Sequence, residues 1–316
     1  MDAPIVVRQY LPILVTAAPG NTRRVFLEFF SAHIRNHHTR KAYLRAVVHF
    51  LDWCDAEGVS SLEAVGPLHV AGWVRSLEGE YSLATTKQCL AAVRMLFDWL
   101  ALSGVVPTNP AKYVKGPRYS VRRGTTPVVD PDEVKRLFAS LGNSTISDLR
   151  DRALIGLMTF TFARIGAALT MNVGDIVTKN RRLWVRLLEK GGKLHEMPCH
   201  HLLEHFLLAY TERAKLVAAD EPLFRSLDRV TGGLTSRRLL HANAYDMIKR
   251  RCRNAGLSAN VCCHSFRATG ITTYLLNGGT IERAALMANH TSIRTTQLYD
   301  HRDDETTLDE VERIAF

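Results

Sequence analysis

The sequence predicts a mainly α-helical protein with a small β-sheet, in which a helical N-terminal domain precedes an α+β domain. Amphipathic helical patterns fill the first third of the chain, and one strand–turn–strand pattern interrupts the helical patterns of the rest. A basic segment rich in proline and glycine separates the two parts. With 316 residues, each part is long enough to bury a core of its own. The predicted boundaries are 1–106, a linker at 107–127, and 128–316.

The first part is predicted to be a bundle of helices. Within 36–59, apolar side chains recur at helical spacing at Tyr43, Val47, Phe50 and Leu51. A similar stripe fills 82–105, and weaker helical patterns occur near 24–34 and 67–77. The Trp and Phe residues of this part are interpreted as core.

The linker carries a concentrated positive charge. The whole chain has a formal net charge of +10, yet 1–106 holds ten basic and nine acidic residues, and 128–316 holds 26 and 22. The linker's basic residues, which have no acidic neighbour within it, are Lys112, Lys115, Arg118, Arg122 and Arg123. A polyanion, most commonly nucleic acid, is the expected partner. A solvated linker that keeps the chain soluble accounts for the charge about equally well.

The second part has a mixed pattern. Pro131 with acidic residues close behind it marks a helix start, and 148–163 is apolar enough for a buried helix. The segments 183–188 and 193–197 flank a Lys-Gly-Gly turn, where glycine permits positive φ, so they predict a β-hairpin. Helical patterns dominate from there to the end.

Composition and the N-terminal pattern predict a folded, soluble protein of the cytosol. Hydrophobic residues make up 46% of the chain, no run approaches the ~18 apolar residues that span a bilayer, and the N-terminal segment lacks a signal-peptide pattern. The six cysteines form no CxxC pair and are expected to be reduced thiols. We predict no metal site, and neither a ligand set nor a phosphate-binding glycine loop has suitable spacing.

Two segments place cationic side chains where they could bind a ligand or take part in catalysis. Arg164 interrupts an apolar run, which is unfavourable for a guanidinium unless a partner or ligand neutralises it. The alternative is an arginine that reaches the surface or pairs with an acid such as Asp175. Lys190 and Lys193 flank the two glycines of the predicted hairpin turn, where solvated lysines are ordinary.

Two further segments lie near the C-terminus. His264 and Arg267 are three residues apart, so on a helix they share a face and could hold a phosphate between them. His290 precedes Tyr299 by nine residues, and Tyr299 lies in a polar, threonine-rich stretch. Taken singly, these residues are explained as surface polar groups and a half-exposed tyrosine. Their order along the chain is the informative feature.

In that order, the residues resemble the catalytic domain of the tyrosine recombinases, the phage integrase family that includes Xer-like recombinases. The family's motifs are an arginine in a helix, a lysine on a β-hairpin, His-x-x-Arg, a second histidine and a tyrosine. This chain supplies them at Arg164, Lys190, His264, Arg267, His290 and Tyr299. The resemblance covers essentially the whole chain, because the family commonly has a helical, SAM-like core-binding domain before the catalytic one.

The chain departs from the family pattern at two places. Ala167 occupies the position, three residues after the first arginine, where the family often has an acidic residue. Ala288 and Asn289 replace the usual Leu-Gly before the second histidine. The hairpin lysine varies across the family, so Lys190 is chosen from its place at the turn, with Lys193 as the alternative.

The resemblance implies a site-specific recombinase that breaks and rejoins DNA through a covalent 3′-phosphotyrosyl intermediate. Tyr299 would attack the phosphorus and conserve the energy of the phosphodiester bond. Arg164 and Arg267 would hold the nonbridging oxygens by forked hydrogen bonds. Neither a metal nor a nucleotide is required.

The other three catalytic candidates would move protons and hold the phosphate. Lys190, with a pKa lowered by neighbouring cations, would protonate the leaving 5′-oxygen. His264 would assist proton movement near the nucleophile, and His290 would hydrogen-bond the scissile phosphate.

The resemblance also implies partners. These are double-stranded DNA with specific recombination sites and further copies of the chain, forming a homotetramer on two sites, with a nucleoid-associated cytoplasmic location and no membrane. The helical pattern at 303–316 has an apolar stripe at Leu308, Val311 and Ile314, which would dock on a neighbouring subunit or pack on its own domain. The linker would lie against the DNA and neutralise several phosphates.

Three other classes of DNA-binding protein share some of these features. A type IB topoisomerase-like enzyme shares the tyrosine chemistry but relaxes supercoils without a specific partner site. A DNA-binding regulator of the same fold would have lost one of the catalytic groups, and all are present in this sequence. A metal-dependent tyrosine endonuclease needs a clustered histidine set, which the doublets at 37–38 and 200–201 do not supply. Integration, excision, transposition and multimer resolution all use the recombinase chemistry, and these residues do not distinguish them.

Overall fold

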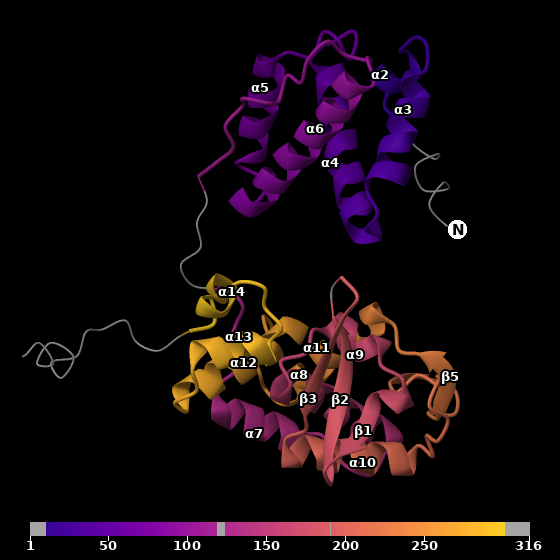
Figure 1. The fold of residues 1–316 in the computed structure, drawn as a ribbon, viewed down its shortest axis with the longest axis vertical. Helices are drawn as coiled ribbons and strands as arrows, with labels where there is room; N and C mark the ends of the chain where they lie inside the picture. The colour runs from indigo at the N-terminus through magenta and orange to yellow at the C-terminus, as the bar shows by residue number, and fades with distance from the viewer. Residues whose placement is uncertain (1–10, 119–123, 190, 301–316) are drawn as a thin grey trace, which may run out of the picture. The chain divides into compact units, whose positions relative to one another are not determined.

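The computed structural model describes residues 11–118, 124–189 and 191–300 (Figure 1). The chain divides into two compact units, Met1–Ser120 and Val121–Phe316, and each has its own apolar core. The predicted fold class is confirmed, since helices dominate and the strands form small antiparallel sheets. No helix among the described residues is long and apolar enough to cross a bilayer.

The first unit is a bundle of helices, as the apolar stripes predict. Its elements are α2 (Ile13–Thr16), α3 (Thr22–Glu28), the π-helix η1 (Phe29–His33), α4 (His37–Ala56), α5 (Pro67–Leu77) and α6 (Leu83–Leu102). The stripe of α4 packs against α6. At the centre, the Phe50 ring lies edge-on to Trp73 and Phe97, with ring centroids 4.9 and 6.1 Å away. The Phe side chains of this unit and Trp73 are buried in the core, as interpreted, and Trp53 and Trp99 are half-buried against it.

The second unit combines helices with two antiparallel sheets. Its helices are α7 (Pro131–Ser140), α8 (Ile146–Phe160), α9 (Ile165–Thr170), the 3-10 helix η2 (Val173–Asp175), α10 (His201–Arg213), α11 (His241–Asn254), α12 (Cys263–Leu276), α13 (Ile281–Met287) and α14 (Ile293–Gln297). Its strands are β1 (Ile176–Lys179), β2 (Arg182–Glu189), β3 (Lys193–Pro198), β4 (Arg225–Leu227) and β5 (Leu234–Arg238).

The predicted hairpin is present as β2 and β3, with Glu189 opposite Lys193. Gly191 and Gly192 have φ of 85° and 76°, the left-handed conformation that glycine adopts without strain. The strand β1 adds a third, outer strand to this sheet. The sequence pattern missed β1 and the β4–β5 pair.

The buried helix α8 is the scaffold for the second unit, and it packs against α10 and α12. Where α12 crosses α8, a Cβ on Gly270 would lie 2.1 Å from the carbonyl oxygen of Thr159. Glycine is therefore required for this close approach. The crossing fixes α12, which carries the His-x-x-Arg motif, against the loop that leads to Arg164.

Candidate active site

Arg267 is the buried centre of the candidate site. Its side chain, on α12, is 1% exposed. One terminal nitrogen donates to the carbonyl of Phe162, and the other donates to the carbonyl of Ala288 at 2.6 Å. Phe162 and Asn289, which follows Ala288, have positive φ of 55° and 47°. Non-glycine residues rarely adopt this conformation, and it is a typical feature of functional sites.

Burial, followed by the positive charge of Arg164, lowers the pKa of Arg267 to about 10. This value is well above neutral pH, so the guanidinium stays charged. The charge of Glu189 and then the Tyr299 side chain act in the opposite direction and raise the pKa.

His290 links Arg267 to the tyrosine segment. Its Nε2 lies 2.6 Å from the second terminal nitrogen of Arg267, and its Nδ1 lies 2.9 Å from Oγ1 of Thr296, a buried residue. An arginine can donate but not accept, so this network assigns Nε2 as the acceptor and Nδ1–H as the donor to Thr296. Burial and then the charges of Arg267 and Arg164 lower the pKa of His290 to about 3, which agrees with a neutral ring.

Tyr299 lies just after α14 and is held through its backbone. Its N–H donates to the carbonyl of Thr296 at 2.9 Å, and its own carbonyl accepts from Oγ1 of Thr272 at 2.8 Å. Its ring stacks on His290, with centroids 5.9 Å apart and an interplanar angle of 11°. The half-buried tyrosine also packs against a small apolar cluster that contains Ile271. Stacking and packing together restrict where the hydroxyl points.

Arg164 lies at the N-cap position of α9 and pairs with Glu189, not with Asp175. One terminal nitrogen of Arg164 is 2.5 Å from Oε2 of Glu189, whose side chain is 3% exposed at the end of β2. Asp175 instead accepts from the backbone N–H of Asn172 at 2.7 Å. The Arg164 side chain is 33% exposed, so part of its guanidinium remains accessible to a ligand.

A small polar cavity of about 150 Å³ lies where these elements meet. It is lined by Arg164, Glu189, Lys193, Asn289, His290, Thr291 and Thr295. Lys193, the alternative hairpin lysine, therefore lies in this cavity. The preferred residue, Lys190, lies outside the described residues. An anion in the cavity would meet cationic donors from both the hairpin and α9.

His264 lies one turn before Arg267 on α12 and is exposed at the protein surface. Partial enclosure of its ring, followed by the charges of Arg267 and Arg164, lowers its pKa. The imidazole is therefore neutral at physiological pH and can accept a proton.

Three of the linker candidates belong to the first unit. Lys112, Lys115 and Arg118 are exposed, and the Lys112 ammonium lies 5.5 Å from the centroid of the Tyr113 ring. Arg122 and Arg123 lie outside the described residues. Exposed cations at the end of the first unit remain available to a polyanion.

The sequence analysis missed Glu189, Thr272 and Thr296. The ion pair of Glu189 has a sequence signal, because Ala167 leaves Arg164 without the acidic residue that the family often supplies, and Glu189 directly precedes the hairpin turn. The two threonines have no such signal. Their contacts depend on how α12 and α14 come together, which spacing along the chain does not reveal.

We expect Glu189→Gln to lower the single-turnover cleavage rate about tenfold, with little change in DNA affinity. The neutral amide no longer holds the Arg164 guanidinium by charge, so this side chain spends less time in the productive orientation. Rates on a nicked DNA substrate at saturating protein measure the effect. Glu196→Gln is the matched control, because Glu196 forms ion pairs with Lys179 and Arg186 on the sheet. Equal rates for the two variants would contradict this role.

Adding Ala167→Glu to Glu189→Gln provides a rescue test. Residue 167 is buried in α9, three positions after Arg164, a spacing at which a new carboxylate would be close enough to pair with the same guanidinium. We expect the double variant to recover part of the lost rate.

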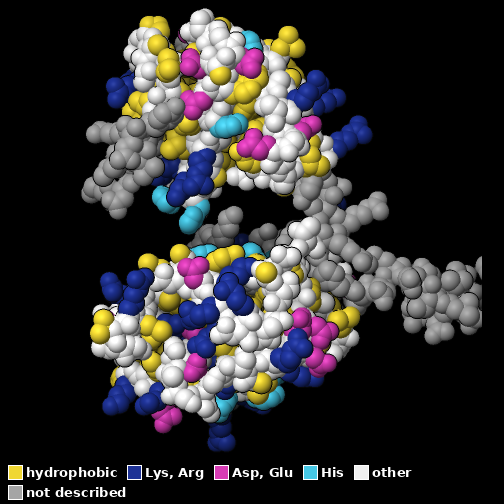
Figure 2. Space-filling view, turned by 180° about the vertical axis from the view of Figure 1, so that it is seen from behind, with side chains coloured by type: hydrophobic (Ala, Val, Ile, Leu, Met, Phe, Trp, Pro, Cys, Tyr) yellow, Lys and Arg dark blue, Asp and Glu magenta, His cyan; other side chains and the backbone are white. Residues whose placement is uncertain are grey.

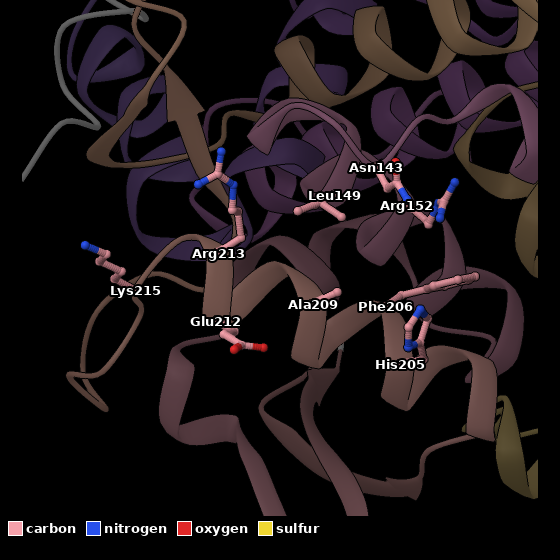
Figure 3. A pocket seen from close by; sticks show the side chains of 9 residues that line it. All are labelled: Asn143, Leu149, Arg152, His205, Phe206, Ala209, Glu212, Arg213 and Lys215. Atoms are coloured by element: carbon pink, nitrogen blue, oxygen red, sulfur yellow. The ribbon is translucent and has the colours of Figure 1, made fainter.

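A second cavity, of about 510 Å³, contains none of the candidate catalytic residues (Figure 3). In Figure 3, Arg213 and Lys215 lie at one end of the set and Arg152 at the other, so their charges do not converge. The Arg152 guanidinium donates to the carbonyls of Phe138 and Leu141. These contacts with backbone carbonyls account for the position of the Arg152 side chain.

Comparison with known proteins places these features in context. The model of the phage integrase family matches residues 127–306, and that of the phage integrase N-terminal SAM-like domain matches residues 26–104. The chain is 28% identical over 273 residues to tyrosine recombinase XerD of Corynebacterium glutamicum, covering 83% of this chain and 87% of that protein. It is 28% identical over 243 residues to tyrosine recombinase XerC of Vibrio parahaemolyticus, covering 74% of each.

Solved structures share the fold at lower identity. The XerH site-specific recombinase in a post-cleavage complex with palindromic difH substrate aligns with a TM-score of 0.68 and 21% identity, over 87% of this chain and 79% of that one. A lambda integrase dimer bound to a COC′ core site aligns with a TM-score of 0.67 and 16% identity, over 90% and 80%.

Proposed function

The chain belongs to the phage integrase family of tyrosine recombinases, and we propose that it recombines specific DNA sites with Tyr299 as its nucleophile. The observation that carries the assignment of Tyr299 is its stacking on His290, whose Nε2 lies 2.6 Å from a terminal nitrogen of Arg267, a buried cation that the fold holds at one place. A phenol beside a fixed guanidinium can attack a phosphorus whose oxygens the same guanidinium binds.

The proposed reaction keeps the number of phosphodiester-type bonds constant. The Tyr299 oxygen forms a bond to phosphorus, the bond to the 5′-oxygen breaks, and the phosphate stays on the tyrosine. His264, neutral by virtue of its lowered pKa, accepts a proton near the nucleophile. Lys190 protonates the leaving 5′-oxygen, with Lys193 of the polar cavity as the alternative donor. Attack by a 5′-hydroxyl from another strand reverses these steps.

The contacts of His290 favour a positioning role in the free protein. Its Nε2 accepts from Arg267, so this atom has no proton to give to a phosphate in the tautomer that the contacts assign. We therefore propose that His290 holds the Arg267 guanidinium and stacks beneath Tyr299. Donation to the scissile phosphate, the role expected from the resemblance, would require Arg267 to release Nε2 and the ring to gain a proton.

DNA is the proposed substrate and the principal partner. The named XerH and lambda integrase structures hold DNA substrates, and Lys and Arg side chains are spread over the visible face of the second unit (Figure 2). The exposed Lys112, Lys115 and Arg118 add to the cations available for phosphate contacts. The proposed location is the nucleoid.

Trapping the covalent intermediate tests the function. On a substrate nicked close to the cleavage position, the short fragment that carries the 5′-hydroxyl diffuses away, and the protein stays attached to DNA. Proteolysis of the adduct should then place the nucleotide on the peptide that contains Tyr299. Recombination between two sites, compared with relaxation of a plasmid without sites, separates a recombinase from a topoisomerase-like enzyme.

We further propose that the segment 304–316 of one subunit docks in an apolar pocket of the next. The segment lies outside the described residues, and its stripe of Leu308, Val311 and Ile314 needs an apolar partner. A pocket of about 630 Å³ between α7, α8, α10 and α12 offers one, with aromatic residues Phe138, Phe160, Phe162, Phe206 and Tyr274 in its lining. A lambda integrase structure is a tetramer on a Holliday junction.

Deleting 304–316 is expected to weaken synapsis of two sites at least tenfold while binding to one site stays unchanged, because the apolar stripe is lost. Native gels with one and two labelled sites measure both steps. Leu202→Asp, at a 42% exposed residue that lines the pocket, should reproduce the defect. Leu208→Asp, at a 48% exposed residue of α10 that does not line it, is the control. Normal synapsis in the deletion and in Leu202→Asp would refute docking.

A further inference from the structure

The end of the linker contacts the backbone next to Tyr299. The N–H of Gly124 donates to the carbonyl of Leu298 at 2.8 Å, and Leu298 directly precedes Tyr299. The contact joins residues that are far apart in sequence and lie within the same compact unit. It therefore gives the linker direct access to the position of the candidate nucleophile.

This contact requires glycine because a side chain would not fit there, and not because the backbone conformation demands it. A Cβ on Gly124 would lie 2.7 Å from the carbonyl oxygen of Leu298, closer than real Cβ atoms approach a backbone atom. Gly124 is not among the glycines with positive φ, so an alanine would be conformationally acceptable there. A substituted side chain would have to push the Leu298 peptide, and with it Tyr299, out of place.

The other end of the same segment is attached to α12. The N–H of Val129 donates to Oγ1 of Thr269 at 2.8 Å, and Thr269 is 2% exposed, two residues after Arg267. The Tyr299 carbonyl is bonded to α12 as well, through Oγ1 of Thr272 at 2.8 Å. Residues 124–129, here called the strap, thus join the Tyr299 backbone to the helix that carries Arg267.

We propose that the strap couples contact between the basic linker and DNA to the placement of Tyr299, with Gly124 as a positioning residue. The exposed cations Lys112, Lys115 and Arg118 precede the first residue of the strap by 12, 9 and 6 residues in the chain. Phosphates that bind them restrain the linker, and the restraint favours the bonded state of Gly124 and Leu298. The inference rests on Tyr299 being the nucleophile. Beyond that role, the position of Tyr299 responds to DNA that the linker binds.

Gly124→Ala tests the contact. We expect the single-turnover cleavage rate at saturating DNA to fall about tenfold, while the Kd for one site changes less than about twofold, because the added methyl displaces the nucleophile and not the DNA-binding surface. Gly233→Ala is the matched control, since a Cβ there would meet only the Thr231 hydroxyl, at 3.4 Å. A Gly124→Ala rate equal to that of the control would overturn the proposal.

Hydrogen exchange gives a second readout that does not depend on activity. In Gly124→Ala, amides in 293–300 should exchange faster than in the parent protein, while those of α8 stay protected. Unchanged exchange in 293–300 would show that Gly124 does not hold this segment. An absence of any covalent adduct in the parent protein would contradict the proposed function, and the exchange experiment would still decide whether the strap holds the segment.

The coupling itself is tested by neutralising the linker. The triple variant Lys112→Gln, Lys115→Gln, Arg118→Gln should cleave more slowly even at saturating DNA. When Gly124→Ala is added, the triple substitution should cause little further loss of rate, because the connection is already broken. If the triple variant weakens binding alone and cleaves at the parent rate once saturated, linker contact and Tyr299 placement are independent, and the proposal fails.

Discussion

Tyr299→Phe is expected to abolish the covalent protein–DNA adduct while leaving binding to a single site near the parent level. Phenylalanine lacks the oxygen that bonds to phosphorus, and no neighbouring group replaces it in the same place. The ring itself is retained, so its stacking on His290 and its packing against the apolar cluster persist. The loss should therefore be chemical and not structural, and adduct on a nicked substrate should fall below detection.

Tyr274→Phe is the matched control for this experiment. Tyr274 lies on α12, packs against the same apolar cluster, and meets the Phe162 ring edge-on at 6.3 Å. Its substitution removes a phenol oxygen from a tyrosine of the same apolar cluster without changing the proposed nucleophile. Adduct formation should remain near the parent rate. An adduct that persists in Tyr299→Phe and disappears in Tyr274→Phe would transfer the nucleophile to Tyr274.

The site could be predicted from sequence where chemistry requires a residue type in a given order. An arginine in an apolar run, a His-x-x-Arg pair and a late tyrosine each have an ordinary explanation taken singly, and their order along the chain resembles the catalytic set of the tyrosine recombinases. In the structure, His290 contacts Arg267, stacks on Tyr299 and lines one cavity with Arg164.

The supporting contacts could not be predicted, because they depend on tertiary packing. The tautomer of His290 follows from a donor that is 23 residues away in the chain, and Glu189 meets Arg164 across 25 residues. Gly124 looks like an ordinary linker glycine until the Leu298 carbonyl is seen beside it. Short strands such as β4 and β5 have too few residues for the alternation of apolar and polar side chains to be recognised in the sequence.

Arg267→Gln is expected to lower the cleavage rate by about 10²–10³-fold, the loss typical when one fixed donor to a transition-state oxygen is removed. The amide occupies part of the same space, but it has no charge and cannot form a guanidinium's forked bonds. Arg267→Lys keeps the charge without the fork, so we expect a rate between those of the parent and Arg267→Gln. Single-turnover rates at saturating DNA, with melting temperatures measured in parallel, distinguish chemistry from unfolding.

Arg150→Gln separates the catalytic role of Arg267 from the effect of disturbing any buried arginine. Arg150 is 3% exposed, and it donates to Asp151 at 2.6 Å and to the carbonyl of Arg225 at 2.9 Å. Both substitutions leave buried acceptors without their donor, so both should lower the melting temperature. Below that temperature, Arg150→Gln should cleave at close to the parent rate. Comparable rate losses in the two variants would mean that Arg267 supports the fold and not the transition state.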